Sequence, residues 1–319
     1  MLTVLFATRN RVRILRDVLE AFCGLDSPAG GWKLVIVDNG STDETAQVLA
    51  FFSDRLPLHS VREPKLGKNS ALNAGLALVE GDLTVLTDDD VFPRSDWLVQ
   101  LRNAADAQPE CSIFGGTVVP RWEVPPPHWI EWVDWGPMFT ITEPSLKEGE
   151  LPPGMITWVQ GPNMAIRACV FESGVRFDTS IGPRGSKYAM GSETELILRL
   201  GQQGHRAWYV QGAIVEHFIR KEQLRREWVL GRAIRWGRGG HRLDPRGKLW
   251  GSIPRHLFRD LPKEGLRMAI AWITFQDEAL FRAHWRFNWL IGKAIEARIL
   301  ARARNSPTHP AVDVARRVL

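Results

Sequence analysis

Residues 81–93 read GDLTVLTDDDVFP, and this stretch decides how the N-terminal half of the chain is interpreted. An apolar run typical of a buried strand ends in Asp88, Asp89 and Asp90. Neighbouring carboxylates repel and each resists leaving water, so an acidic surface turn is the ordinary explanation. The apolar residues VFP that follow favour a different explanation, in which a cation lies against the three aspartates. In an extended segment Asp88 and Asp90 point to the same side and can address one cation.

Other apolar strand patterns precede this one and alternate with helical patterns. The strand patterns lie at residues 2–8, 32–40, 56–63 and 82–90, and the helical ones at 14–22, 41–52 and 68–81. Ser41 and Glu44 resemble a capping box and predict a helix start at Ser41. Such alternation predicts an α/β fold with a mainly parallel central sheet and helices on both faces. Ligands of these sheets bind at the carboxyl ends of the strands, where Thr8, Asp38 and the acidic cluster lie.

Composition and charge divide the chain unequally. Residues 219–319 carry 22 Lys and Arg against 9 Asp and Glu, whereas the first 218 residues carry 19 against 27. A polyanion would therefore be attracted to the C-terminal third alone. Three widely spaced cysteines exclude a disulfide framework, and neither a signal peptide nor a membrane-spanning stretch is recognisable. We expect a cytoplasmic protein.

Five residues have a functional interpretation beside an ordinary one. Lys68 begins a helix, where a cation is unfavourable unless it meets an anion such as phosphate. Glu193 and Glu195 interact favourably with the helix dipole if they lie in the first turn of a helix, but either is also a candidate general base. His217, near the end of a strand pattern, is either a buried hydrogen-bonded residue or a ligand of the same cation. Asp38 is explained by the Asp-Asn-Gly turn that it begins, or by ligand binding.

The ordered set of motifs resembles the family 2 glycosyltransferases. The similar segments are TVLFATRNR, VIVDNGSTDET, GKNSALNAG and LTDDDVFP, followed by GPNMAIR, FDTSIG, GSETELILRLGQQG and IVEH, and they cover residues 2–218. The resemblance implies a Rossmann-like GT-A fold. It also implies transfer of a hexose from a nucleotide-diphosphate sugar, UDP being the common nucleotide of that family, with inversion and with Mn²⁺ or Mg²⁺ as cofactor.

The resemblance also implies roles for individual residues. The nucleotide sugar would be bound by Thr8, Asn10, Arg11, Asp38, Lys68, Asp88 and Asp89, and the metal by Asp90 of the DXD motif with His217. Glu193 would be the catalytic base, with Glu195 as competitor. Two departures stand out: Asn39 replaces a second aspartate after Asp38, and Ser192-Glu193 replaces the usual Glu-Asp pair. Because each departure removes an acidic residue from the family's motifs, a catalytically weak or inactive nucleotide-sugar-binding protein is the alternative.

On this basis residues 1–110 are expected to bind the nucleotide sugar and residues 111–218 to bind the acceptor and carry the base. Residues 219–319 form a basic helical extension, rich in Trp and Arg. Peripheral attachment of residues 220–319 to an anionic inner membrane leaflet would suit a lipid-linked acceptor. A basic cap folded onto the acidic catalytic domain or an oligomer contact explains the same charges. No nucleic-acid recognition motif is present, and no nucleic-acid partner is expected.

The glycan or lipid-linked acceptor has few sequence signals. Trp129, Trp132 and Trp135 lie in a Pro-rich segment that is either a stacking wall for the acceptor or a loop fixed by aromatic packing. Asn163, in the GPN motif, is the fourth residue assigned to the acceptor.

Overall fold

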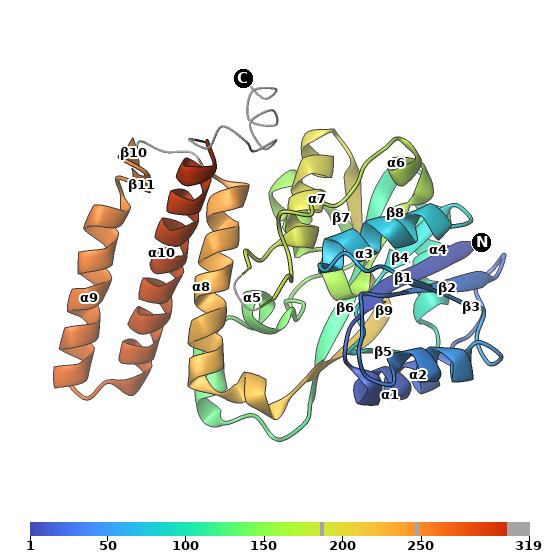
Figure 1. The fold of residues 1–319 in the computed structure, drawn as a ribbon, viewed down its shortest axis with the longest axis horizontal. Coiled ribbons are helices and arrows are strands. Elements are labelled where there is room, and N and C mark those ends of the chain that lie inside the picture. Colours follow the sequence, from blue (N-terminus) through green and yellow to red (C-terminus); the bar gives the residue numbers. More distant parts are fainter. Residues whose placement is uncertain (186–187, 246–248, 305–319) are drawn as a thin grey trace. The chain divides into compact units, whose positions relative to one another are not determined.

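The computed structural model describes residues 1–185, 188–245 and 249–304. The chain divides into two compact units. The first comprises residues 1–125, 134–186 and 192–221, and the second residues 126–133, 187–191 and 222–319 (Figure 1).

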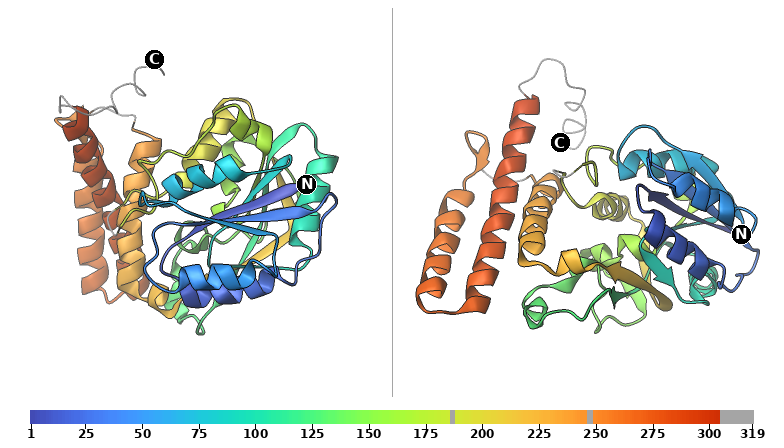
Figure 2. Two further views of the ribbon diagram at one scale, coloured as in Figure 1. Left: turned by 45° about the vertical axis from the view of Figure 1, so that its right-hand side comes forward. Right: turned by 60° about the horizontal axis from the view of Figure 1, so that its bottom comes forward.

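The first unit is built around one mixed sheet, in the order β3-β2-β1-β4-β8-β6-β9-β5, with β7 also paired to β9. The strands are β1 (Leu2–Thr8), β2 (Trp32–Asp38), β3 (Leu58–Arg62), β4 (Leu83–Leu86), β5 (Val91–Pro93), β6 (Cys111–Trp122), β7 (Gly149–Leu151), β8 (Met164–Arg167) and β9 (Arg206–Ile219). Strands β1 to β4 are parallel, and so are β6 and β9, while β8 is antiparallel to both β4 and β6. The predicted α/β class, with helices on both faces of the sheet, is confirmed (Figure 2).

The helices of this unit lie on both faces. They are α1 (Val12–Phe22), α2 (Thr45–Phe52), α3 (Lys68–Gly75), α4 (Trp97–Ala107), α5 (Trp135–Phe139), α6 (Ala168–Glu172) and α7 (Ser192–Gln202), with short 3-10 turns between them. Helix α2 begins at Thr45, later than the predicted Ser41. The Ser41 hydroxyl does not cap the helix, because it accepts from Asn10 N at 3.0 Å, and Asp43 Oδ1 accepts from the backbone N–H and the hydroxyl of Thr45 instead.

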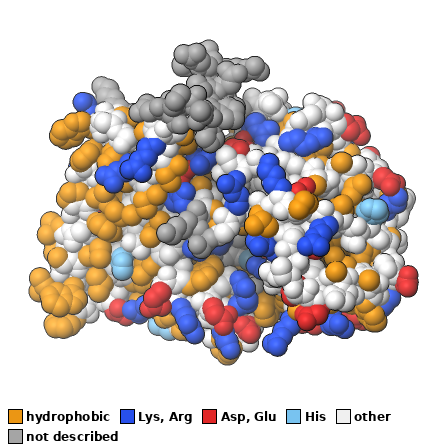
Figure 3. Space-filling view, in the orientation of Figure 1, with side chains coloured by type: hydrophobic (Ala, Val, Ile, Leu, Met, Phe, Trp, Pro, Cys, Tyr) orange, Lys and Arg blue, Asp and Glu red, His pale blue; other side chains and the backbone are white. Residues whose placement is uncertain are grey.

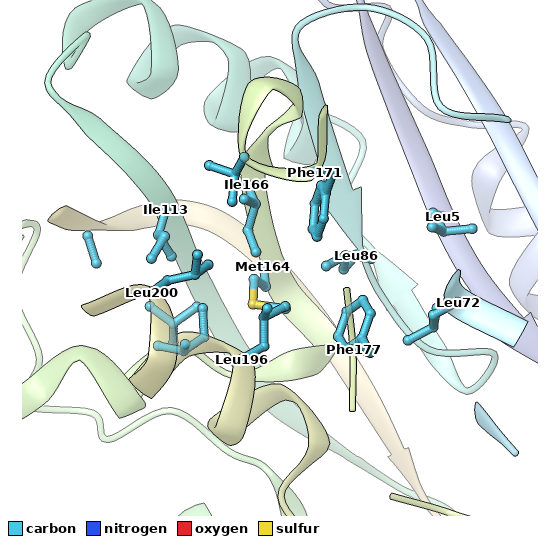
Figure 4. Packing of buried hydrophobic residues seen from close by; sticks show 14 of the residues in the cluster. Leu5, Leu72, Leu86, Ile113, Met164, Ile166, Phe171, Phe177, Leu196 and Leu200 are labelled. Atoms are coloured by element: carbon cyan, nitrogen blue, oxygen red, sulfur yellow. The ribbon is translucent and has the colours of Figure 1, made fainter. Parts of the chain in front are cut away.

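Successive side chains of the parallel strands point to opposite faces and so build two cores. On one face Phe6 contacts Phe22 of α1, and Phe22 contacts Trp97 of α4. On the other, Leu5 packs with Leu72 of α3 and with residues of β8, α6 and α7, including Met164, Phe171 and Leu196 (Figure 4). Burial of these side chains fixes the strand register, and the register fixes where the strand ends meet.

The second unit contains the helices α8 (Arg226–Leu243), α9 (Leu257–Ile273) and α10 (Asp277–Arg304), with a hairpin of β10 (Leu249–Trp250) and β11 (Ile253–Pro254). Helix α10 packs against both α8 and α9 (Figure 2). Glu296 of α10 is fully buried between Arg238 and Arg242 of α8, with N–O distances of 2.7 and 2.5 Å. Among the described residues no helix is both long enough and apolar enough to span a bilayer.

Glycines allow α8 and α10 to approach closely, and this contact can be tested. A Cβ on Gly292 of α10 would lie 2.1 Å from the Ile234 carbonyl oxygen of α8. We expect Gly292→Ala to lower the free energy of unfolding by about 1–3 kcal/mol through overpacking. Gly265→Ala in α9 is the control, because no atom lies within 4 Å of its added Cβ. It should raise stability by about 0.5–1 kcal/mol. Denaturant unfolding measures both, and equal effects would contradict the helix contact.

Candidate active site

The acidic cluster lies between β4 and β5, where the strand end meets the loop that follows β1. Asp89 and Asp90 are buried. Thr8 donates its hydroxyl hydrogen to Asp89 Oδ2 at 2.8 Å. Arg11 approaches both carboxylates: its Nη1 lies 3.2 Å from Asp89 Oδ1 and also binds Asp90 Oδ2. One guanidinium therefore offsets the charge of two crowded carboxylates.

Burial and charge act differently on the two buried carboxylates. Burial, together with the charges of Asp90 and Asp88, outweighs Arg11 and raises the pKa of Asp89 to about 6. Burial also opposes ionisation of Asp90, but the His217 ring and the Arg11 guanidinium outweigh it and lower the pKa of Asp90. The Arg220 side chain adds to that lowering. Of these two buried carboxylates, Asp90 is therefore the one that stays ionised to lower pH.

Lys68, the first residue of α3, connects the cluster to the start of α7. Its ammonium binds Asp88 Oδ1 and lies 2.7 Å from Glu193 Oε1. Burial works against the ammonium, but the two carboxylates outweigh it and raise the pKa of Lys68. The backbone N–H of Lys68 donates to the Pro183 carbonyl, which attaches the loop before α7 to α3. Asn69 and Asn73 fasten the same loop through the carbonyls of Asp178, Ile181 and Phe177.

Glu193 is held in the first turn of α7 by close packing. Ser192 donates its hydroxyl hydrogen to Glu193 Oε2 at 2.5 Å. Oε1 is buried and, although paired in charge with Lys68, accepts no hydrogen bond of good geometry. Gly161 lies against this side chain so closely that a Cβ there would come within 2.7 Å of Glu193 Cγ. Glu195 differs, because Arg199 binds both of its oxygens, at 2.8 and 3.1 Å.

His217 lies on β9, opposite Val91 of β5, and its ring reaches the cluster. Nδ1 is 2.6 Å from the Phe139 carbonyl oxygen, which can only accept, so Nδ1 carries the proton and donates. Nε2 faces Asp90 Oδ1 at 3.6 Å. Asp90 Oδ1 and His217 Nε2 thus face one another, and Nε2 can bind a cation once the ring has lost the proton whose charge lowers the pKa of Asp90. Among the described residues no group of three or more His, Cys, Asp or Glu side chains has the arrangement of a metal site.

The remaining residues predicted to contact the nucleotide lie around the ends of β1 and β2. Asn10 has a left-handed backbone conformation (φ 52°), and its Oδ1 accepts from Thr42 N at 2.8 Å. Asp38 Oδ1 accepts from Ser41 N at 2.8 Å, which is the turn chemistry of its own loop. Asn39 binds three backbone groups, including the N–H of Gly67, the residue before α3. These contacts shape the loops.

The residues assigned to the acceptor are distributed between the two units. Trp129 and Trp132 belong to the second unit, where their rings pack on Phe281 beside the Arg226 guanidinium. Trp135 belongs to the first unit and contacts Trp122. Asn163 is fully buried; its amide donates to the carbonyls of β6 and of the bulge in β9, and its Oδ1 accepts from the indole of Trp97.

Three residues that shape the site were not identified from the sequence. Gly161 limits the position of Glu193, Ser192 binds its carboxylate, and the Phe139 carbonyl orients His217. Ser192 could have been inferred from its place beside Glu193. A lone glycine in a loop and a backbone carbonyl give no sequence signal, because their importance depends on tertiary contacts.

Comparison with known proteins adds relatives in one family. The model of "Glycosyl transferase family 2" matches residues 3–159. The glucosyl-dolichyl phosphate glucuronosyltransferase of Haloferax volcanii is 27% identical over 206 residues, which are 63% of this chain and 64% of that protein. A beta-monoglucosyldiacylglycerol synthase of Nostoc sp. is 30% identical over 103 residues, 31% of this chain and 22% of the relative. The chain thus spans less than two thirds of these curated relatives.

Solved structures share the fold. The mannosyltransferase PcManGT of Pyrobaculum calidifontis, in complex with GDP-Man and Mn²⁺, has a TM-score of 0.58 at 20% identity, covering 99% of this chain and 78% of that one. S. aureus TarS 1-349, in complex with UDP-GlcNAc, has a TM-score of 0.54 at 12% identity, covering 94% and 91%. These likenesses confirm the predicted GT-A-like architecture. The motifs, the family match and the fold agree, and residues 3–159 belong to Glycosyl transferase family 2.

Proposed function

We propose that this protein transfers a hexose from a nucleotide-diphosphate sugar to an acceptor hydroxyl with inversion, using a divalent metal and Glu193 as general base. The observation that carries the proposal is the meeting of the acidic cluster, Lys68 and Glu193 at one edge of the sheet. In this assignment residues 1–110 bind the donor and residues 111–218 the acceptor. UDP is the proposed nucleotide.

The residues present fit a hard divalent cation. Asp90 offers a carboxylate oxygen, and His217 offers Nε2 with its proton held on Nδ1 by a carbonyl, as metal-bound histidines commonly are. Two protein ligands suit Mg²⁺ or Mn²⁺, which usually complete their shell with water and substrate phosphates. When bound there, the cation would neutralise charge on the departing nucleotide. We assign Asp90 and His217 to the metal.

The side chains around the metal ligands are assigned to the nucleotide, the diphosphate and the acceptor hydroxyl. Thr8, Asn10, Arg11, Asp38, Asp88 and Asp89 would contact the nucleotide. Lys68 would contact the diphosphate, for which its ammonium is a suitable partner. Glu193 would accept the proton of the acceptor hydroxyl at Oε1, the oxygen that lies 2.7 Å from the Lys68 ammonium. Glu195 is the weaker candidate for the base, because Arg199 already binds both of its oxygens.

A lipid-linked acceptor at an anionic membrane surface is the proposed partner. The names of the Haloferax and Nostoc relatives refer to a dolichyl phosphate and to a diacylglycerol, both of which are lipids. The basic residues 219–319 would attract such a surface. The protein would then act peripherally at the cytoplasmic leaflet. We keep Trp129, Trp132, Trp135 and Asn163 as the proposed acceptor region, with Asn163 in a supporting position.

The ion pair between Lys68 and Glu193 gives a pH dependence with a definite sign. Burial alone would raise the pKa of Glu193, but Lys68 and the Ser192 hydroxyl outweigh it and hold that pKa below its ordinary value. The wild-type base therefore stays ionised as pH falls, and the part of the acid limb of kcat/KM that reports Glu193 should lie below the ordinary carboxyl range, apart from the titration of Asp89 near 6. In Lys68→Met burial is unopposed by the ammonium, and the limb should move above that range.

Lys68→Arg is the control, because it keeps the positive charge. Its acid limb should stay near that of the wild type, whatever happens to donor affinity. Identical limbs in the wild type and in Lys68→Met would exclude Glu193 as the titrating base. The profile is measured as kcat/KM against pH with each variant shown to be folded.

Donor turnover tests the proposed function itself. UDP-, GDP- and dTDP-sugars are incubated with the protein and Mn²⁺ or with chelator, and nucleotide release is followed with and without lipid-phosphate acceptors. We expect release from one nucleotide class, dependent on metal and accelerated by acceptor, with inverted product configuration by NMR. Nucleotide binding without release from any donor would favour the inactive binding protein instead.

A further inference from the structure

Helix α9 carries a row of large apolar side chains that face solvent. Phe258, Leu266, Ile270 and Ile273 recur on one face and are exposed by 48%, 62%, 53% and 65%. The opposite face of α9 carries Glu264, which is buried and 3.5 Å from Arg286 of α10. The outer face is therefore the one turned away from α10, and Figure 3 shows hydrophobic side chains gathered over this part of the chain.

Aromatic residues extend this row at both ends. Trp250 of the β10–β11 hairpin is 68% exposed, and its ring centroid lies 5.1 Å from that of Phe258. At the other end Trp272 is 70% exposed and Phe275, in the turn before α10, is 94% exposed. Exposed residues of this size are unfavourable in water when they are contiguous, and they mark an interaction surface.

A row of basic residues runs beside the apolar one. Its members, spaced four residues apart, are Arg255, Arg259, Lys263 and Arg267. Only two acidic residues lie within the same stretch of helix. Asp260 pairs with Arg259 at 2.9 Å, and Glu264 is buried and pairs with Arg267 at 2.7 Å. The exposed surface of α9 therefore combines apolar side chains with an excess of positive charge.

We propose that this surface, defined as Trp250, Phe258, Leu266, Ile270, Trp272, Ile273 and Phe275 with the flanking basic row, inserts into the headgroup region of an anionic bilayer. The proposal deepens the membrane association proposed above by naming the surface that makes it. An amphipathic helix with basic residues along its apolar face lies in the interface plane, and Trp and Phe suit the depth of the headgroups. In this proposal α9 lies along the membrane surface, with its apolar row toward the acyl chains.

The charges favour a bilayer over other occupants. A second copy of this chain would bring the same excess of positive charge to the contact, which opposes self-association. A nucleic acid would pair with the basic row but leave the apolar row in water. Anionic lipid satisfies both, since phosphate headgroups meet the arginines while the acyl region receives the apolar side chains.

Vesicle binding of the full chain tests this surface. The protein is co-sedimented with vesicles of phosphatidylcholine alone and of phosphatidylcholine with phosphatidylglycerol, at low and high salt. We expect binding to the anionic vesicles that weakens with salt. Arg259→Gln with Lys263→Gln should weaken it on the order of fivefold for each residue. Trp272→Ser with Phe275→Ser should weaken it on the order of tenfold for each residue.

The control is Phe51→Ser on α2, which removes a comparably exposed aromatic (56%) and should leave vesicle binding unchanged. Thermal unfolding shows that the variants are folded, and calorimetry with nucleotide reports the proposed donor site independently. Intact nucleotide binding without vesicle binding would overturn this surface and leave the proposed function standing. A dimer that Trp272→Ser with Phe275→Ser converts to monomer, without vesicle binding, would overturn it in favour of a second copy.

Discussion

Asp90→Asn is expected to lower metal-dependent turnover by roughly a thousandfold, because a bound cation contributes several kcal/mol of charge stabilisation in such sites. The substitution is nearly isosteric and removes one negative charge from a crowded cluster. Asparagine retains a neutral oxygen, a much weaker ligand for Mn²⁺ or Mg²⁺. Arg11 keeps Asp89 as a partner, at 3.2 Å, so the loop after β1 should stay in place.

The expected signature is loss of the metal effect on nucleotide affinity together with loss of turnover. Asp54→Asn, at an exposed carboxylate, is the control and should behave as the wild type. Thermal unfolding should show some loss of stability in Asp90→Asn, since the lowered pKa of Asp90 means that His217 and Arg11 stabilise its charge in the fold. Wild-type turnover with Mn²⁺ in a folded Asp90→Asn protein would remove Asp90 from the metal site.

Glu193→Gln is expected to lower kcat by about 10²- to 10⁴-fold, the usual contribution of a general base. The glutamine keeps the shape that Gly161 accommodates and can still accept from Ser192, so the fold of the loop is preserved. Donor affinity should change little, since Lys68 retains Asp88 as a partner. The loss should therefore appear in kcat and not in binding of the nucleotide.

Glu195→Gln is the matched control two residues along the same helix. Its carboxylate is engaged by Arg199, and we expect turnover within a few-fold of the wild type, with some loss of stability from the broken ion pair. The reverse pattern, an active Glu193→Gln and an inactive Glu195→Gln, would transfer the base to Glu195. Full activity of both would exclude carboxylate catalysis at the start of α7.

Hydrophobic periodicity was enough to predict the parallel part of the sheet. Strands β1, β2 and β4 are near-continuous apolar runs, so their ends, and with them Thr8, Asp38 and Asp88, could be placed at one edge from sequence. The predicted start of α2 at Ser41 is wrong, because Ser41 does not cap the helix. Ser41 instead uses its hydroxyl to accept from Asn10 N, at 3.0 Å.

The charged residues of the site could be predicted from the sequence, whereas the contacts that depend on the backbone of distant residues could not. Three adjacent aspartates and a lysine at a helix start are visible in any sequence. The contact of Gly161 with Glu193 joins residues on different elements, and the orientation of His217 depends on a carbonyl 78 residues away. The tryptophans illustrate the same limit, since Trp132 and Trp135 are three residues apart and yet belong to different units.

Isothermal titration of the intact protein with UDP, GDP and dTDP, each with and without Mn²⁺, tests the central claim most directly. We expect tight binding of one nucleotide, UDP by proposal, that requires the metal and is lost in Asp90→Asn. Absence of binding to all three nucleotides in the presence of Mn²⁺, with a protein shown to be folded, would contradict it.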